Sequence, residues 1–232
     1  ERWTELRATY FGMCSRVDHQ FGLLVETLRD ANLYDQSAIF VFSDHGDFTG
    51  DYGLVEKTQN TFQDCLSRVP FIVKPPAGTA SVPGIREQLT ELIDFPATVY
   101  DFAGIEPPYW HFGKSLRSVL AETNAIHRDA VFCEGGRLRQ EVQASERESV
   151  NSTDGRGLYS PRIDQQLRED EVFPHSKATM CRDEQFKYVR RAYETDEFYD
   201  LGADPGETTN LINEPSSARS IERMKERMLA WY

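Results

Sequence analysis

The chain has 232 residues, with 38 Asp and Glu against 26 Lys and Arg, so its formal net charge is −12 at pH 7. This balance argues against nucleic-acid binding, because the phosphate backbone selects for basic surfaces. A hydrophobic fraction of 39% fits a globular fold of one large or two small domains, and no apolar run is long enough for a membrane span. We therefore expect neither nucleic acid nor membrane as a partner, and the sequence indicates no compartment.

A long amphipathic helix is predicted at the start of the chain. Apolar residues recur at three- and four-residue steps between Leu6 and Leu28, which is the spacing of one helical face. We expect this helix to run from about residue 2 to residue 31, with Asn32 as its stop. A short apolar strand, residues 38–42, follows, of the kind that is buried on both faces of a parallel sheet.

The candidate functional stretch comes directly after this strand. Asp44 and His45 stand at the carboxyl end of the strand, where open α/β sheets place their sites. A carboxylate oxygen suits a hard divalent cation and a neutral imidazole can share it, so the pair is a candidate metal site. Three glycines then permit unusual backbone angles, and Lys57 on the same loop can hold an anionic substrate. This pattern favours metal-assisted hydrolysis of an anionic ester; the alternative is an ordinary surface turn.

The remaining sequence predicts further helices and strands in alternation. We expect a short helix within residues 61–66, a buried strand over 68–74, an extended piece over 89–93, helices over 94–104 and within 113–120, strands over 131–136, 178–181, 186–191 and 197–201, and a closing helix over 216–232. Asp94 is assigned a capping role, because Pro96 stands in the first turn of its helix. His111 and His127 are expected to be exposed. The polar stretch 137–171 predicts a flexible insertion or a substrate-facing lid, and we favour the lid.

The stretch after the first strand resembles the second metal-binding segment of the sulfatases, within the alkaline phosphatase superfamily. The matching residues read Ser43-Asp-His-Gly-Asp, Gly50-Asp-Tyr-Gly-Leu, Lys57 and Arg68-Val-Pro-Phe-Ile-Val, and later family-like segments are 91–105, 113–120, 186–189, 197–201 and 204–211. The spacing of Asp44 and Lys57 is similar to that of an Asp-His subgroup, which includes iduronate sulfatases and phosphonate monoester hydrolases. The resemblance covers nearly the whole chain, but only the C-terminal half of the family fold.

This resemblance implies an α/β fold class. Residues 1–125 would form part of an alkaline-phosphatase-like sandwich, the C-terminal part of the catalytic domain, and residues 126–232 a small antiparallel α+β subdomain with a closing helix. The implied activity is hydrolysis of a sulfuric ester on a sulfated small molecule or sugar.

The resemblance also implies roles for individual residues. Asp44 and His45 would bind a divalent metal, with calcium expected first and magnesium or manganese as alternatives, and Lys57 would contact the sulfate. Because the C-terminal subdomain borders the family's substrate cleft, specificity contacts are expected from a further set of residues: His175, Lys177 and Arg182.

The catalytic nucleophile is missing from this stretch of sequence. In the family it is a Cys, converted to formylglycine, within a C-x-[PA]-x-R motif, and none of the four cysteines stands in that motif. We expect the nucleophile and two further metal-binding Asp residues in an N-terminal half outside this chain, so residues 1–232 alone should be inactive and should show a companion chain or an apolar face along residues 1–75. The alternatives are a phosphonate or phosphate ester hydrolase of the same superfamily, and a non-catalytic fragment that completes another chain.

Overall fold

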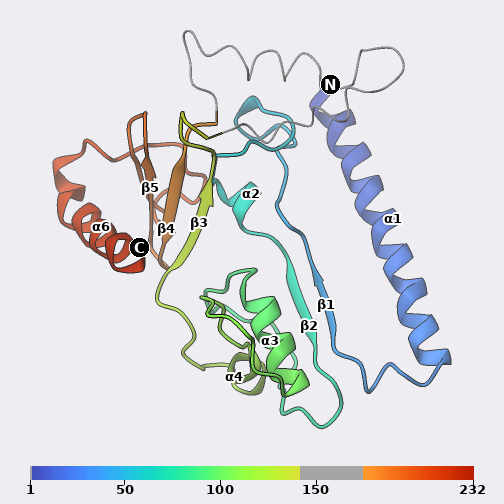
Figure 1. Cartoon of the computed structure of the whole chain (residues 1–232). Helices are drawn as coiled ribbons and strands as arrows, with labels where there is room; N and C mark the ends of the chain where they lie inside the picture. Colours follow the sequence, from blue (N-terminus) through green and yellow to red (C-terminus); the bar gives the residue numbers. More distant parts are fainter. Residues whose placement is uncertain (1, 142–174) are drawn as a thin grey trace. The chain divides into compact units, whose positions relative to one another are not determined.

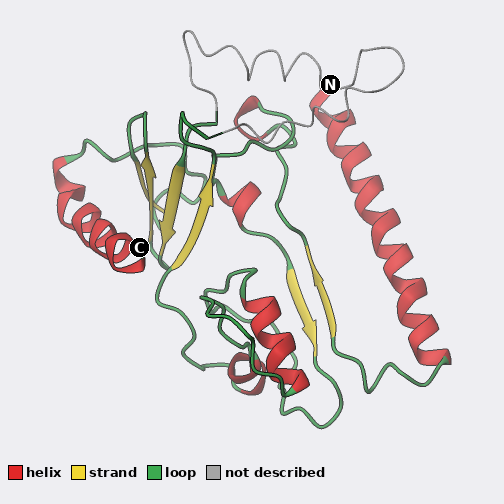
Figure 2. Cartoon of the chain, in the orientation of Figure 1, coloured by secondary structure: helices red, strands yellow, loops and turns green. Residues whose placement is uncertain are grey.

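The computed structural model describes residues 2–141 and 175–232 (Figure 1). The chain divides into two compact units. Unit 1 comprises Glu1–Lys57 and Gln63–Val131, and unit 2 comprises Thr58–Phe62 and Phe132–Tyr232. Helices and strands occur in both units, so the α/β class is confirmed (Figure 2). Most of the stretch expected to form a lid lies outside the described residues.

Unit 1 begins with the long helix α1 (Arg2–Asp30), which confirms the prediction from hydrophobic spacing. The helix is followed by Asn32 in the left-handed conformation, with φ of 57°. No residue of α1 is buried, and Phe11, Val17 and Leu24 are each well over half exposed. These exposed apolar side chains lie within residues 1–75, where we expected a companion chain or an apolar face. Within the described residues, no helix is long and apolar enough to span a membrane.

Strands β1 (Ile39–Phe42) and β2 (Phe71–Lys74) form a two-stranded sheet in unit 1. They pair antiparallel, with Val41 opposite Ile72, so the expectation of a parallel sheet was wrong for this pair. The strands are also only partly covered in the structure, whereas we expected burial on both faces. An apolar run predicts that a strand exists, but the direction of its partner depends on the connection between them.

Three helices accompany this sheet: α2 (Asp64–Ser67), α3 (Asp94–Ala103) and α4 (Arg117–Ala121). Helix α3 covers β1, because the ring of Phe95 packs edge-on against Phe40 at a centroid distance of 4.9 Å. It ends at Gly104 with φ of 65°, as predicted. In the piece expected to be extended over residues 89–93, no strand forms, and residues 92–93 make a turn that leads into α3.

The predicted capping role of Asp94 is also wrong. Asp94 is fully buried and accepts hydrogen bonds from the backbone N–H groups of Glu91 (3.0 Å) and Lys114 (2.8 Å). Its carboxylate also accepts from His127 Nε2 at 3.0 Å and forms an ion pair with Arg128. His127 was expected to be exposed, yet its side chain is 3% exposed because it packs onto this carboxylate. These residues form a buried polar centre that joins α3 to the segments around residues 114 and 127.

Unit 2 is a four-stranded sheet with a closing helix. The strands β3 (Val131–Gly135), β4 (Ala178–Arg182), β5 (Phe186–Arg191) and β6 (Glu197–Asp200) neighbour one another in that order, and β4–β5 and β5–β6 pair antiparallel. After a short 3-10 turn, η3 (Pro215–Ser217), helix α6 (Ala218–Trp231) packs on β4 and β5 (Figure 1). The helix buries three apolar side chains: Ile221, Met224 and Met228. The predicted hairpin, sheet and closing helix are all confirmed.

A buried ion pair fixes the segment 58–62 to this sheet. The amine of Lys187 lies 2.5 Å from Glu207 Oε1 and donates to the backbone carbonyl of Phe62 at 2.7 Å. Both charged side chains are 1% exposed. Since a buried charge is tolerated only when it is paired and hydrogen-bonded, this contact specifies where the 58–62 segment packs within unit 2.

Candidate functional site

The structure brings the two predicted metal ligands together just beyond β1. His45 Nδ1 is 2.7 Å from the Gly46 carbonyl oxygen, and a carbonyl can only accept, so Nδ1 carries the proton. In the neutral imidazole, Nε2 then keeps its lone pair, and it lies 3.6 Å from Asp44 Oδ2. The other carboxylate oxygen, Oδ1, accepts from the His45 backbone N–H at 3.0 Å. One carboxylate oxygen and one imidazole nitrogen are therefore presented side by side.

This geometry fits two ligands of a metal ion. Metal-binding histidines commonly donate their second ring N–H to a carbonyl or carboxylate, as His45 does here. The side chains of Asp44 and His45 are 84% and 42% exposed, so a cation can reach both. Calcium takes about six to eight oxygen ligands. Across residues 2–141 and 175–232, no group of three or more His, Cys, Asp or Glu is placed to hold a metal, so the pair supplies only part of a coordination sphere.

Gly46 fixes the position of this pair relative to α2. Its N–H donates to the Leu66 carbonyl at 2.8 Å. A Cβ at this position would lie 1.9 Å from the carbonyl oxygen of Cys65, a distance that no side chain can occupy. The glycine is required here because of this close approach of two backbones.

We predict that Gly46→Ala lowers the free energy of unfolding by about 1–3 kcal/mol, the usual cost of forcing extra atoms into a packed site. Denaturant unfolding of the variant measures this change. Gly12→Ala is the control for loss of a glycine, because a Cβ on Gly12 meets nothing within 4 Å and Gly12 lies within helix α1 without a positive φ, so this change should not lower stability. Equal stability of Gly46→Ala and the wild type would contradict the close contact.

The residues after Asp47 form a narrow hairpin, residues 48–56, which we call the hairpin loop. Thr49 and Val55 form an antiparallel bridge, and the Glu56 N–H donates to the Phe48 carbonyl at 3.1 Å. Phe48 is 1% exposed and anchors the base of the hairpin loop. Lys57 follows Glu56 directly, so the closed hairpin returns Lys57 to the stretch of chain that carries Asp44 and His45.

The closed hairpin loop contains backbone strain. Tyr52 and Glu56 have positive φ angles of 55° and 66°, although neither is glycine. A non-glycine residue in this region costs about 1–3 kcal/mol. Asp51 offsets part of the cost, since its Oδ2 accepts from the Thr49 N–H at 3.3 Å and from the Thr49 hydroxyl at 3.4 Å. The glycines in the sequence predicted unusual backbone angles in this loop. They did not predict that two larger residues, Tyr52 and Glu56, would also adopt positive φ angles.

Lys57 has the properties of an anion-binding group. Its side chain is exposed, and its amine makes no ion pair or hydrogen bond with any residue that the structure describes. An ammonium group on a structured loop with no internal partner is available to an anionic ligand.

The three candidates in unit 2 lie at different places. His175 has a positive φ of 58°, and its carbonyl accepts from the Arg137 N–H at 2.8 Å. Lys177 precedes β4 and its amine lies 3.4 Å from Glu134, whereas Arg182 is the last residue of β4. The rise of a strand separates these two backbone positions by about 16 Å. The structure therefore does not gather the candidates into one site, and their contact with substrate stays a prediction.

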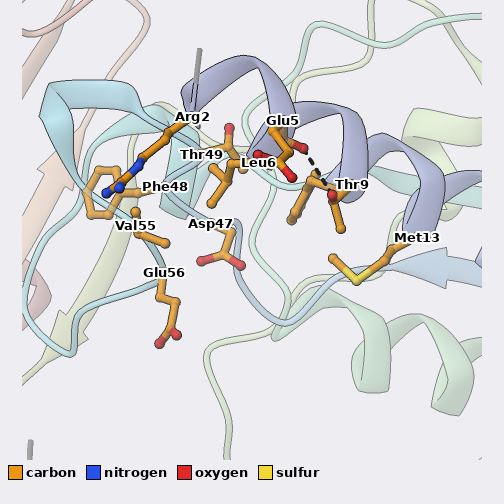
Figure 3. A pocket seen from close by; sticks show the side chains of 11 residues that line it. Arg2, Glu5, Leu6, Thr9, Met13, Asp47, Phe48, Thr49, Val55 and Glu56 are labelled. Atoms are coloured by element: carbon orange, nitrogen blue, oxygen red, sulfur yellow. Dashed lines mark hydrogen bonds between the residues drawn. The ribbon is translucent and has the colours of Figure 1, made fainter.

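A cavity that the sequence did not reveal lies in unit 1, beside the hairpin loop (Figure 3). Its volume is about 440 Å³, and it is bounded by the first turns of α1 on one side and by the start and end of the hairpin loop on the other. Asp47 lines the cavity, and its Oδ1 is buried without a hydrogen-bond partner in the described structure. The helical spacing of Leu6, Tyr10 and Met13 placed these residues on one face of the helix, but the local sequence did not indicate which segment that face contacts.

The Sulfatase family profile matches residues 1–105 of this chain. The chain is 28% identical over 229 residues to the multifunctional alkaline phosphatase superfamily protein PehA of Trinickia caryophylli, covering 98% of this chain and 40% of that protein. It is 30% identical over 212 residues to choline-sulfatase of Rhizobium meliloti (strain 1021), covering 90% and 33%. It is 26% identical over 231 residues to N-acetylglucosamine-6-O-sulfatase of Bacteroides thetaiotaomicron, covering 97% and 35%. The chain thus spans 33–40% of the length of these relatives.

The phosphonate monoester hydrolase of Agrobacterium radiobacter has a similar structure. The TM-score is 0.75 at 27% sequence identity, covering 97% of this chain and 40% of that chain. This similarity confirms the expected alkaline-phosphatase-like architecture, in which antiparallel sheets and helices are mixed.

Proposed function

Since this chain belongs to the sulfatase family, within the alkaline phosphatase superfamily, we propose that the protein containing it hydrolyses sulfuric esters with the help of a divalent metal. The observation that carries the proposal is the placement of Asp44 Oδ2 and His45 Nε2 side by side, 3.6 Å apart, on the segment that also carries the exposed amine of Lys57, which has no partner among the described residues.

We assign each group a role. Asp44 and His45 would hold the metal, with calcium as the first choice and magnesium or manganese as alternatives, since the remaining ligands decide between these ions. When bound, a metal supplies Lewis-acid charge neutralisation at the ester. The carbonyl of Gly46 keeps His45 in the tautomer that leaves Nε2 unprotonated. Lys57 would hold the ester's anionic oxygens and stabilise charge that develops on them.

The formylglycine nucleophile and the remaining metal ligands would lie outside residues 1–232. Three facts support this part of the proposal. None of the four cysteines stands in a C-x-[PA]-x-R motif, and the chain spans only 33–40% of its relatives. The described residues also place only two ligands together. We therefore expect catalysis only in the protein expressed together with its preceding segment.

The substrate would be a sulfated small molecule or sugar. Relatives named choline-sulfatase and N-acetylglucosamine-6-O-sulfatase support this class. The net charge of −12 does not oppose an anionic substrate, because a bound cation and Lys57 dominate the local field. His175, Lys177 and Arg182 are the proposed specificity contacts.

A second candidate is hydrolysis of phosphonate or phosphate monoesters, which the similarity to the phosphonate monoester hydrolase favours. Both esters present anionic oxygens to a lysine and a metal, so the site alone does not choose between them. Comparing kcat/KM for 4-nitrophenyl sulfate and for a phenylphosphonate monoester decides the main activity. If the protein hydrolyses neither ester, the non-catalytic alternative remains, in which this chain only completes another chain.

For the metal site, we predict that Asp44→Ala reduces metal affinity by about tenfold or more, because it removes one of two neighbouring donors. The measurement is metal content by mass spectrometry after dialysis against a series of metal buffers. Asp18→Ala is a matched control, since Asp18 and His19 form a second Asp-His pair on the exposed surface of α1. Undiminished metal content and turnover in Asp44→Ala would reject the assignment.

A further inference from the structure

Two side chains near the start of α1 contact the hairpin loop. Arg7 Nε donates a hydrogen bond to the Thr49 carbonyl at 2.9 Å. The indole of Trp3 covers Gly50 so closely that a Cβ on Gly50 would lie 3.0 Å from Trp3 Cε3. We propose that Arg7 and Trp3 are positioning residues that hold the hairpin loop closed and thereby place Lys57 for substrate. This inference rests on the proposed role of Lys57.

The backbone of the hairpin loop is hydrogen-bonded within itself, for example from the Gly50 N–H to the Leu54 carbonyl at 3.0 Å, but the loop buries little apolar surface. Leu54 and Val55 are close to half exposed, and among the apolar residues of the loop only Phe48 is buried. Two residues, Tyr52 and Glu56, are also held in the left-handed backbone region. A segment with little buried apolar surface and strained backbone angles opens readily unless neighbouring elements hold it.

The contacts with α1 act at the position that controls this opening. Arg7 binds the carbonyl of Thr49, which forms the bridge with Val55. The two hydrogen bonds that flank the bridge run from the Gly50 N–H to the Leu54 carbonyl (3.0 Å) and from the Glu56 N–H to the Phe48 carbonyl (3.1 Å), and Lys57 directly follows the second. Opening the bridge would therefore release Lys57 from its place beside the chain that carries Asp44. Misplacing a charged group by about 1 Å can cost on the order of a hundredfold in rate, so the closed loop matters for turnover.

The bond from Arg7 can be tested by a matched pair of variants, Arg7→Gln and Arg7→Met, in the protein that carries its preceding segment. Gln places an N–H donor at the position of Arg Nε, whereas Met has similar length and no donor there. We expect Arg7→Met to lower kcat/KM about tenfold, the effect of losing one hydrogen bond from a charged donor, and Arg7→Gln to stay within about threefold of wild type. Arg16→Met is the control on the same helix, because Arg16 is exposed and pairs with no described residue.

Two further measurements separate positioning from general destabilisation. Hydrogen exchange at the amides of residues 48–57 should be faster in Arg7→Met, with exchange in unit 2 unchanged. In a Lys57→Ala background, Arg7→Met should cause no further loss of kcat/KM, because it acts through Lys57. Unchanged exchange, or an equal loss in both backgrounds, would overturn the inference. Normal turnover of Lys57→Ala alone would instead refute the proposed role of Lys57, while the exchange data would still decide whether Arg7 holds the loop.

Discussion

Lys57→Ala should lower kcat/KM for a sulfate ester by about a hundredfold or more, the usual cost of removing one preorganised electrostatic stabiliser from an active site. The amine has no partner among the described residues, so in the free protein it contributes little to folding. We therefore expect the melting temperature to stay close to that of the wild type. Steady-state kinetics and thermal unfolding of the same preparation measure both quantities.

Arg68→Ala is a suitable control for Lys57→Ala. It removes one exposed positive charge from the same unit, and its contact with Asp64 is a weak surface pair at 3.9 Å. If loss of overall positive charge slowed substrate association, both variants would lose activity and both losses would shrink at high salt. A loss confined to Lys57→Ala assigns the effect to direct contact with the ester. Near-normal turnover would show that Lys57 is only a surface charge.

The side-by-side placement of Asp44 and His45 was predictable because its determinants are local. Asp44 and His45 are neighbours in sequence, and the apolar run before them predicts the strand end on which they stand. The closure of the hairpin loop was not predictable in the same way. It depends on the pairing of Phe48 with Glu56 and on contacts from Arg7, 42 positions away from Thr49. Glycines indicate where the backbone is free to turn, but not which segments the turn brings together.

The corrections to the predicted fold have the same origin. The runs that form β1 and β2 predicted strands, but their antiparallel pairing follows from the connection between them. Asp94 and His127 were each assigned the role that their local sequence favours, a helix cap and an exposed loop residue. Their actual contact joins positions 33 apart in the chain, and nothing near either residue encodes it.

Asp94→Asn should destabilise unit 1 by about 3–5 kcal/mol, because it breaks a buried ion pair and leaves the other charge uncompensated. Asp94 is fully buried, and the side chain of its partner Arg128 is 8% exposed. Asn keeps the shape of the side chain, so the change tests charge and hydrogen bonding and leaves packing volume nearly constant. The measurement is denaturant unfolding at neutral pH.

The matched control for Asp94→Asn lies on the same helix. Asp101 pairs with Arg117 at 3.0 Å, but both side chains are more than a third exposed. Asp101→Asn should therefore cost less than about 1 kcal/mol, as surface pairs usually do. Equal losses of unfolding free energy in the two variants would show that burial of the Asp94 ion pair does not increase its contribution to stability.

The pH dependence of stability provides a second test of the Asp94 ion pair, because the direction of the change with pH can be predicted. Burial alone would raise the pKa of Asp94, but hydrogen bonds from His127, Arg128 and the backbone amides of Glu91 and Lys114 outweigh burial and hold it far below its usual range. Because the pKa is depressed in the folded state, the stabilisation is complete at neutral pH, begins to fall at about pH 5, just above the unfolded pKa near 4, and is lost progressively as the pH falls further. Wild-type stability should therefore fall in acid more steeply than that of Asp94→Asn, and the two curves should converge. Parallel curves from pH 7 to pH 2 would mean that the Asp94 carboxylate is not held ionised by these partners.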